Sequence, residues 1–319
     1  METSPKQVEL SVIIPVRNAA EDLPDLLLAF DRQTLSTERY ELLIVDDCST
    51  DSTPEVIDRH PHATLLRAPR HGGSYAARNF ALQHAQAPLI AFTDGDCTPS
   101  EDWLERGLER LAAGPARLVA GHVEVPLGEH PSAVALVDFS RHLNQERAVR
   151  DGFGATANLW AFRVIFDSIG TFNEKLISGG DTELGHRAGA AGFQVEYAPD
   201  VAVSHPPRSH GRELARKAYR LGFGAAQHRK HAEGPLRTRN RIYLHPGAYK
   251  PGGKLPGLDR LERHGIRLTT SQHARMKAVS WLYVQLPMCA GNFSGAWNRG
   301  PLALERARAQ GLQEAREPS

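Results

Sequence analysis

Two aspartates, Asp94 and Asp96, lie one residue apart directly after the apolar run of residues 88–92. A run of this length and composition is typical of a buried strand. Paired carboxylates at a strand end suit a hard divalent cation such as Mg²⁺ or Mn²⁺, which takes oxygen ligands and often binds substrate phosphates as well. A solvated turn is the alternative, because Asp and Gly also favour turns. The pattern therefore predicts either a metal site or a plain turn.

The elements around this pair alternate between strands and helices. The predicted strands are residues 9–15, 40–47, 63–69 and 88–94, with helices between them at 22–33, 49–60 and 72–86. This alternation predicts an α/β fold with a doubly wound, mostly parallel sheet flanked by helices. Later in the chain, strands are predicted at 117–126 and 193–206, and helices at 132–149, 179–192 and 212–230.

Polar residues follow several of the predicted strands. In open α/β sheets, ligands bind outside the carboxyl ends of the strands, where this chain has Arg17, Asn18, Asp47 and the Asp94–Asp96 pair. We therefore expect these residues to converge on one acidic crevice. A diphosphate would bind there through a divalent cation. Asp47 suits a base N–H or ribose hydroxyl as partner, while residues 49–51 suit the cap of the next helix.

A glycine-rich turn at residues 72–73 leads into a predicted helix that carries Arg78. The guanidinium either meets a phosphate or packs inward against Asp94, and the sequence leaves both open. The stretch at 152–157, GFGATA, fits the G-x-G-x-x-A pattern of dinucleotide folds. It lacks the first-strand context that this motif requires, so we do not interpret it as a nucleotide loop.

Composition and charge limit the function classes. The chain has 319 residues, of which 41% are hydrophobic and 24% charged, and its net charge of +1 argues against a nucleic-acid binder. Three widely spaced cysteines provide no disulfide framework. The polar N-terminus lacks the apolar core of a secretory signal, and no apolar run approaches the roughly 20 residues that span a bilayer. We expect a cytoplasmic protein.

The near-zero net charge hides a strong asymmetry. Residues 1–204 contain 17 Lys and Arg against 30 Asp and Glu, whereas residues 205–280 contain 17 against 4. The shift predicts two domains, 1–205 and 206–319, the second basic and mainly helical. Its charge is expected to face phosphate, a membrane surface or the acidic half of the chain.

Five stretches together resemble one known family. SVIIPVRN, LLIVDDCSTDST, RHGGSYAARN, IAFTDGDC and ISGGDTELGHRAGAAGFQVEY occur in the order and spacing of glycosyltransferase family 2. The resemblance extends from Leu10 to His205, nearly two thirds of the chain. It implies a GT-A fold, a nucleotide-sugar donor, a divalent metal and inversion at the anomeric carbon.

The resemblance also implies roles for residues near the nucleotide. Asp47 matches the residue that contacts the base, and Pro15, Arg17 and Asn18 would line the same pocket. Asp94, Gly95 and Asp96 match the D-x-D motif, which binds the nucleotide sugar and the metal. Asp96 is the expected direct metal ligand, and Arg78 is expected near the diphosphate.

The remaining implied roles concern proton transfer and a further metal contact. Asp181 matches the aspartate of the E-D-x-x-L-x-x-R pattern, the usual catalytic base. The preceding Glu is replaced here by Gly180, which removes a neighbour that often contacts the acceptor. Glu183 is a fallback base, although two residues along a helix it would point elsewhere. His205 matches a metal or diphosphate contact of some relatives, or is a strand end without function.

The leading hypothesis is an inverting, metal-dependent glycosyltransferase that acts on a glycan or lipid-linked acceptor. A catalytically silent nucleotide- or glycan-binding module of the same fold is one alternative, and a peripheral membrane adaptor is another. Residues 276–293 are the most apolar late stretch, and we expect Pro287 to interrupt them. They either anchor the enzyme at a membrane surface or form a helix packed on the catalytic domain.

Overall fold

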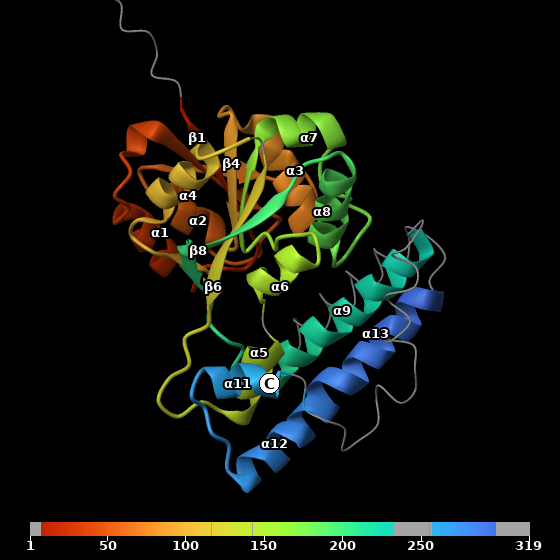
Figure 1. The fold of residues 1–319 in the computed structure, drawn as a ribbon. Coiled ribbons are helices and arrows are strands. Elements are labelled where there is room, and N and C mark those ends of the chain that lie inside the picture. The colour runs from red at the N-terminus through yellow and green to blue at the C-terminus, as the bar shows by residue number, and fades with distance from the viewer. Residues whose placement is uncertain (1–7, 116, 142, 232–254, 256, 298–319) are drawn as a thin grey trace, which may run out of the picture. The chain divides into compact units, whose positions relative to one another are not determined.

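A computed structural model describes residues 8–115, 117–141, 143–231, 255 and 257–297. The chain forms two compact units, drawn in Figure 1. The first unit takes Met1–Leu127, His142–Glu174 and Gly180–Pro206, and the second takes Gly128–Arg141, Lys175–Gly179 and Pro207–Ser319. The second unit therefore includes two short segments that come before residue 206.

The first unit is built on one sheet. Among the described residues its strands are β1 (Leu10–Val16), β2 (Tyr40–Asp46), β3 (Ala63–Arg67), β4 (Leu89–Thr93), β5 (Thr98–Pro99), β6 (Leu118–Glu124), β7 (Asn158–Phe162) and β8 (Val195–Ser204). They lie in the order β3-β2-β1-β4-β7-β6-β8-β5. β3, β2, β1 and β4 are parallel neighbours, and β6 is parallel to β8. β7 runs antiparallel to both β4 and β6, so the sheet is mixed, with more parallel than antiparallel pairs.

Helices cover both faces of this sheet (Figure 1). They are α1 (Leu23–Asp31), η1 (Thr37–Arg39), α2 (Thr53–Asp58), α3 (Ser74–His84), α4 (Trp103–Ala112), α6 (Gln145–Arg150), α7 (Arg163–Ile169) and α8 (Gly180–Ala190). Alternate residues of β1, such as Val12 and Ile14, pack with Trp103 of α4 in a fully buried cluster. Because both faces of the sheet are covered, the central strands are apolar along their whole length and turn polar only at their ends.

The predicted helix at 132–149 is two helices, α5 (Ala133–Arg141) and α6. The side chain of Asn144 accepts a hydrogen bond from the Arg147 N–H at 2.8 Å, which caps the start of α6. A capping residue has an extended backbone, so it separates two helices even where the apolar pattern continues. α5 belongs to the second unit and α6 to the first.

The described part of the second unit is helical. Besides α5 it contains α9 (Gly211–His231), α11 (Leu258–Arg263), α12 (Thr270–Ser280), the π-helical turn η4 (Trp281–Gln285) and α13 (Leu286–Trp297). α9 and α13 pack closely through glycines. A Cβ on Gly222 would lie 2.0 Å from the Met288 carbonyl oxygen, and one on Gly291 would lie 2.0 Å from that of Tyr219.

The prediction that Pro287 interrupts residues 276–293 is wrong for the backbone. Leu286 N–H donates to the carbonyl of Trp281, five residues back, and α13 continues through Pro287. Proline is tolerated in the first turn of a helix, where its missing N–H would have no intrahelical partner. In the π-helical turn before Pro287, backbone hydrogen bonds join residues five apart instead of four. None of the described helices has both the length and the apolar character needed to cross a bilayer.

Candidate active site

The loops after β1 and β2 are tied together at the carboxyl edge of the sheet. Asn18 N–H donates to Ser49 Oγ at 2.8 Å, and Asn18 Oδ1 accepts from Thr50 N–H at 2.8 Å. Asn18 has a left-handed backbone with φ of 50°, which asparagine tolerates better than most residues. Pro15 lies opposite Val45 in the β1–β2 register, so Pro15, Arg17 and Asn18 all lie beside the end of β2.

Asp47 is buried just beyond the end of β2 and holds the next loop. Its carboxylate accepts from His71 Nδ1 at 2.7 Å, from Gly72 N–H at 2.7 Å and from Gly73 N–H at 2.8 Å. Burial alone raises the pKa of Asp47, but these hydrogen bonds outweigh it and keep the pKa below its ordinary value. Asp47 is therefore ionised at neutral pH, and it shapes the glycine-rich turn that precedes α3.

Arg78 of α3 is buried and forms an ion pair with Asp94, with Nη2 to Oδ1 at 2.5 Å. This is the inward arrangement of the two that the sequence leaves open. Among the described residues, however, Nε of Arg78 is buried without a hydrogen-bond partner, as is Nε of Arg17. Unsatisfied buried N–H groups are costly, so two such donors at one edge fit an anionic ligand.

Gly95 allows the D-x-D loop to approach β1. A Cβ at this position would lie 2.7 Å from Cγ1 of Val16, closer than real carbon contacts come. The glycine thus lets the loop lie against the end of β1, with Asp94 and Asp96 on either side of it. Both aspartate side chains are partly exposed, at 33% and 38%.

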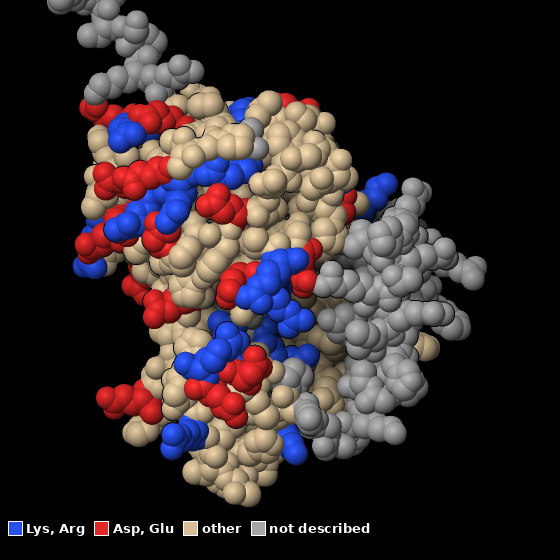
Figure 2. Space-filling model, viewed as in Figure 1, with Lys and Arg blue, Asp and Glu red and all other residues tan. Residues whose placement is uncertain are grey.

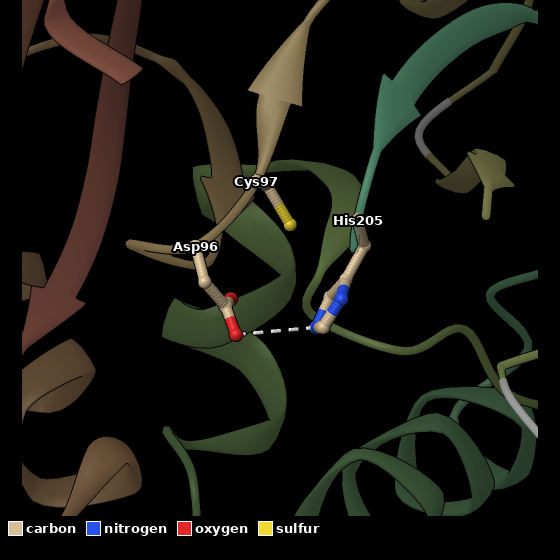
Figure 3. A group of neighbouring side chains, drawn as sticks. All are labelled: Asp96, Cys97 and His205. Carbon is tan, nitrogen blue, oxygen red and sulfur yellow. Dashed lines mark ion pairs between the residues drawn. The ribbon is translucent and has the colours of Figure 1, made fainter. Parts of the chain in front are cut away.

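Asp96, Cys97 and His205 form a group that has ligand atoms for a metal (Figure 3). One ligand atom from each lies within 4.8 Å of the others. The imidazole Nε2 of His205 is 3.4 Å from Oδ2 of Asp96, across the gap marked by the dashed line. Burial, followed by the charges of Asp94 and Asp96, raises the pKa of the Cys97 thiol well above its ordinary value, so Cys97 is a neutral thiol here.

The hydrogen bonds of His205 show whether this group fits a cation. Nδ1 lies 2.9 Å from the carbonyl oxygen of Pro206, which can only accept, so Nδ1 carries a proton. In the neutral imidazole, Nε2 then turns a lone pair toward the Asp96 carboxylate. Two electron-rich atoms facing each other suit a cation between them, and donation from the second ring nitrogen to a carbonyl is typical of metal-binding histidines. Asp96 and His205 therefore fit a divalent metal.

Asp181 lies in the first turn of α8, where Thr156 Oγ1 donates to Oδ1 at 3.2 Å. Burial raises the pKa of Asp181 to about 6; the charge of Arg78 opposes this shift and that of Asp94 adds to it. Asp181 therefore lies within electrostatic range of the Arg78–Asp94 pair. A carboxylate with a pKa near 6 suits proton transfer at neutral pH.

The departure from the family pattern at Gly180 has a steric cause. A Cβ on Gly180 would lie 2.6 Å from Cζ of Tyr75, and Gly180 N–H donates to the Tyr75 hydroxyl at 2.9 Å. Tyr75 thus occupies the space where a side chain at position 180 would begin. Glu183 binds Arg187 through Oε1 to Nε at 2.7 Å and Oε2 to Nη2 at 2.9 Å, so it is engaged in a structural ion pair.

Sequence reasoning missed four residues that build this site. His71 orders the loop below Asp47, Tyr75 fills the space beside Gly180, Thr156 bonds Asp181, and Cys97 lies behind Asp96. Thr156 lies in the stretch GFGATA, which resembles a dinucleotide motif. That resemblance gives no indication of the hydrogen bond from Thr156 to Asp181. All ten residues predicted for the site lie in the first unit, and their individual roles stay predictions.

Comparison with known proteins identifies the family. A model described as Glycosyl transferase family 2 matches residues 11–169. Glycosyltransferase AglE of Haloferax volcanii is 35% identical over 223 residues, which cover 68% of this chain and 73% of AglE. The chain belongs to glycosyltransferase family 2. The pre-mycofactocin glycosyltransferase of Mycobacterium tuberculosis is 30% identical to this family 2 glycosyltransferase over 234 residues, which cover 70% of this chain and 48% of that protein.

Solved structures share the fold of this glycosyltransferase. The mannosyltransferase PcManGT from Pyrobaculum calidifontis, in complex with GDP-Man and Mn²⁺, has a TM-score of 0.62 at 19% identity and matches over 94% of this chain and 91% of its own. Staphylococcus aureus TarS 1–349, in complex with UDP, has a TM-score of 0.53 at 14% identity over 91% of this chain and 90% of its own. At these identities the likeness concerns the fold alone, and it confirms the predicted GT-A fold.

Proposed function

We propose that this glycosyltransferase is an inverting, metal-dependent enzyme that moves a sugar from a nucleoside diphosphate to an acceptor hydroxyl. The observation that carries the proposal is the buried Asp181 carboxylate, whose pKa is raised to about 6 and which interacts electrostatically with the Arg78–Asp94 pair. Asp181 can take a proton, and Arg78 suits a diphosphate. A single displacement needs a base for the acceptor hydroxyl and positive charge for the leaving diphosphate in the same site.

The donor is a nucleotide sugar in this proposal. PcManGT was solved with GDP-Man and Mn²⁺, and TarS with UDP and with UDP-GlcNAc, which supports a nucleoside diphosphate as the leaving group. Asp47 and the Pro15–Asn18 edge contact the nucleoside, and the unsatisfied donors of Arg17 and Arg78 face the phosphates. Asp96 and His205 would hold a Mn²⁺ or Mg²⁺ ion, which when bound supplies positive charge to the diphosphate.

The proton path follows from these positions. The acceptor oxygen forms a bond to the anomeric carbon as the bond from that carbon to the diphosphate oxygen breaks. Asp181 takes the proton of the acceptor hydroxyl, which becomes more acidic as its oxygen bonds to the anomeric carbon. The electron pair of the broken carbon–oxygen bond leaves with the nucleoside diphosphate. Thr156 orients the Asp181 carboxylate, and Arg78 offsets the negative charge that develops on the phosphates. Base catalysis of this kind contributes about 10²–10⁴-fold to the rate.

Donor hydrolysis tests the proposal because water replaces the unknown acceptor. Release of nucleoside diphosphate is measured from GDP- and UDP-sugars with Mn²⁺ and with EDTA. We expect Asp181→Asn to bind the donor normally and to lose at least about 100-fold in rate, and Asp96→Ala to lose Mn²⁺-dependent donor binding. Asp167→Asn, an exposed carboxylate of α7, is the matched control and should behave as wild type. Near-normal turnover by Asp181→Asn would refute its role as base.

We also propose that residues 1–205 are the catalytic domain of a cytoplasmic enzyme and that residues 206–319 bring it to a membrane that holds a lipid-linked acceptor. The η4 turn and α13 pack on α9 with one side, but Leu282, Leu286 and Phe293 are 49%, 41% and 69% exposed. Their spacing of four and seven residues puts them on one helix face. Lys and Arg outnumber Asp and Glu by 17 to 4 over residues 205–280, which suits an anionic bilayer.

Vesicle cosedimentation tests this contact with the full chain. Binding to vesicles of phosphatidylcholine and phosphatidylglycerol should exceed binding to phosphatidylcholine alone. The double variant Leu282→Gln, Phe293→Gln should lose at least about tenfold in partitioning, because each buried CH₂ adds about 0.8 kcal/mol. Val164→Gln is the control, because Val164 is an apolar residue of α7 in the first unit that is as exposed as Leu282, at 49%. Equal partitioning of the double variant and this control would refute the contact.

A further inference from the structure

The second unit contains a buried carboxylate surrounded by cationic groups. Asp138 of α5 is fully buried, and its Oδ1 accepts from Lys217 Nζ of α9 at 2.7 Å. Its Oδ2 accepts from the backbone N–H of Arg208 at 3.0 Å. The Arg208 guanidinium lies 3.6 Å from the same oxygen, which is an ion-pair distance but too long for a hydrogen bond.

A third cation adds to this group. Arg260 of α11 stacks over the ring of Phe139 at 4.7 Å, and the charge of Asp138 acts on it. The Asp138 carboxylate is thus the shared counter-ion of three cationic side chains, which come from three segments of the chain. Burial lowers the pKa of Lys217 to about 8, with Arg208 and Arg220 lowering it further and Asp138 opposing the shift. Lys217 is therefore mostly charged at neutral pH although little of it reaches solvent.

The acidic side chains of the second unit do not balance this excess. Glu213 lies 3.9 Å from His210, and Asp259 pairs with Arg263 at 3.1 Å. Residues 232–254, which the structure does not describe, contain a single acid, Glu233, against five Lys and Arg. Figure 2 shows basic and acidic side chains next to one another over the visible face of the first unit. In that unit Arg110 pairs with Asp200 at 2.8 Å.

Asp138 supplies one negative charge to three cationic side chains, so the group keeps a net positive charge that suits an anionic ligand. Arg208 and Lys217 are both partly exposed, with side chains 23% and 17% exposed, so a ligand can reach them. The Arg208 guanidinium makes no hydrogen bond within the described part of the chain, and Lys217 uses one of its three donors on Asp138. A guanidinium fork beside an ammonium matches the oxygens of a phosphate group.

We propose that Arg208 and Lys217 form a phosphate site and that the phosphate belongs to the acceptor. This step rests on the proposed transferase function, because it assigns the ligand to the second substrate. Arg208 follows His205 of the donor site by three positions in the sequence. Asp138 then has a positioning role, because its hydrogen bonds to the Lys217 ammonium and the Arg208 backbone N–H hold both residues where they can bind the phosphate.

Calorimetric titration of the full chain with citronellyl phosphate, citronellol and inorganic phosphate tests the site. We expect citronellyl phosphate to bind and citronellol to bind at least about tenfold more weakly. Arg208→Gln keeps the backbone bond to Asp138, and it should weaken citronellyl phosphate binding about tenfold, the effect of losing one charge-assisted hydrogen bond. Arg216→Gln, at an exposed arginine of α9 next to Lys217, is the control and should bind as wild type.

Each other outcome has a defined meaning. Equal binding of citronellyl phosphate by Arg208→Gln and by the control would overturn the site. Equal affinity for inorganic and citronellyl phosphate would assign the site to free phosphate and overturn the acceptor assignment. Thermal unfolding and nucleoside diphosphate binding of Arg208→Gln should match wild type, which separates a lost phosphate site from a misfolded chain. Absent donor hydrolysis by wild type would refute the transferase mechanism without affecting this titration.

Discussion

Replacing Asp181 by Asn should make the protein more stable while it removes activity. In the folded chain the pKa of Asp181 is raised from 3.8 to about 6, mainly by burial. The ionised carboxylate is therefore disfavoured in the folded state by about 3 kcal/mol at neutral pH. Asn retains an oxygen that can accept from Thr156 but has no charge to desolvate. We expect Asp181→Asn to gain up to about 3 kcal/mol at about pH 7.5.

The sign of the pH dependence follows from proton linkage. Between about pH 4 and 6 the folded wild type binds a proton at Asp181 that the unfolded chain does not bind, so wild-type stability falls as pH rises through this window. Above it, the full penalty is present; below about pH 4, both states are protonated and the penalty disappears. The advantage of Asp181→Asn should therefore be largest at neutral pH and shrink toward pH 4.

Thermal unfolding of the ligand-free protein at several pH values measures this difference. For a unit of about 150–250 residues, about 3 kcal/mol corresponds to a midpoint increase of about 6–12 °C. Asp167→Asn in α7 is the control, because its side chain is exposed and a change there should leave the midpoint within about 1–2 °C. A midpoint for Asp181→Asn no higher than that of the control at neutral pH would refute the reasoning, as would a gain that persists at about pH 4.

Three further predictions follow from the site. Donor hydrolysis should fall about tenfold per pH unit below about pH 6, since protonated Asp181 accepts no proton, and a flat profile would contradict its role as base. Gly180→Glu should lower the stability by about 1–3 kcal/mol through its clash with the Tyr75 ring, and thermal unfolding of the double variant with Tyr75→Ala should show recovery rather than additive loss. His205→Ala should weaken calorimetric Mn²⁺ binding at least about tenfold in the presence of nucleoside diphosphate, and an unchanged affinity would mean that Nε2 does not face the ion.

Local sequence patterns predicted most of the sheet. The apolar runs that became β1, β2 and β4 end at polar residues, and in a parallel sheet those ends share one edge. The strand ends alone therefore predict that Asn18, Asp47 and the D-x-D loop lie close together. Periodicity failed at residues 132–149, because a capped break at Asn144 leaves the apolar pattern on either side unchanged. It also failed at Pro287, where the hydrogen-bond register, which the sequence does not display, decides the outcome.

Contacts between distant segments determined the rest of the site. The sequence presents Asp181 as an acid at a helix start, but its pKa depends on burial and on the charges of Arg78 and Asp94, which are about a hundred residues away. The sequence likewise leaves open whether Arg78 binds a phosphate or Asp94, and the folded chain forms the ion pair with Asp94. Residue types and spacing determined which chemistry this chain is equipped for, since they set charge, reach and strand ends. Only the tertiary structure decided the protonation and partners of each group, because desolvation and electrostatics depend on neighbours in space and not in sequence.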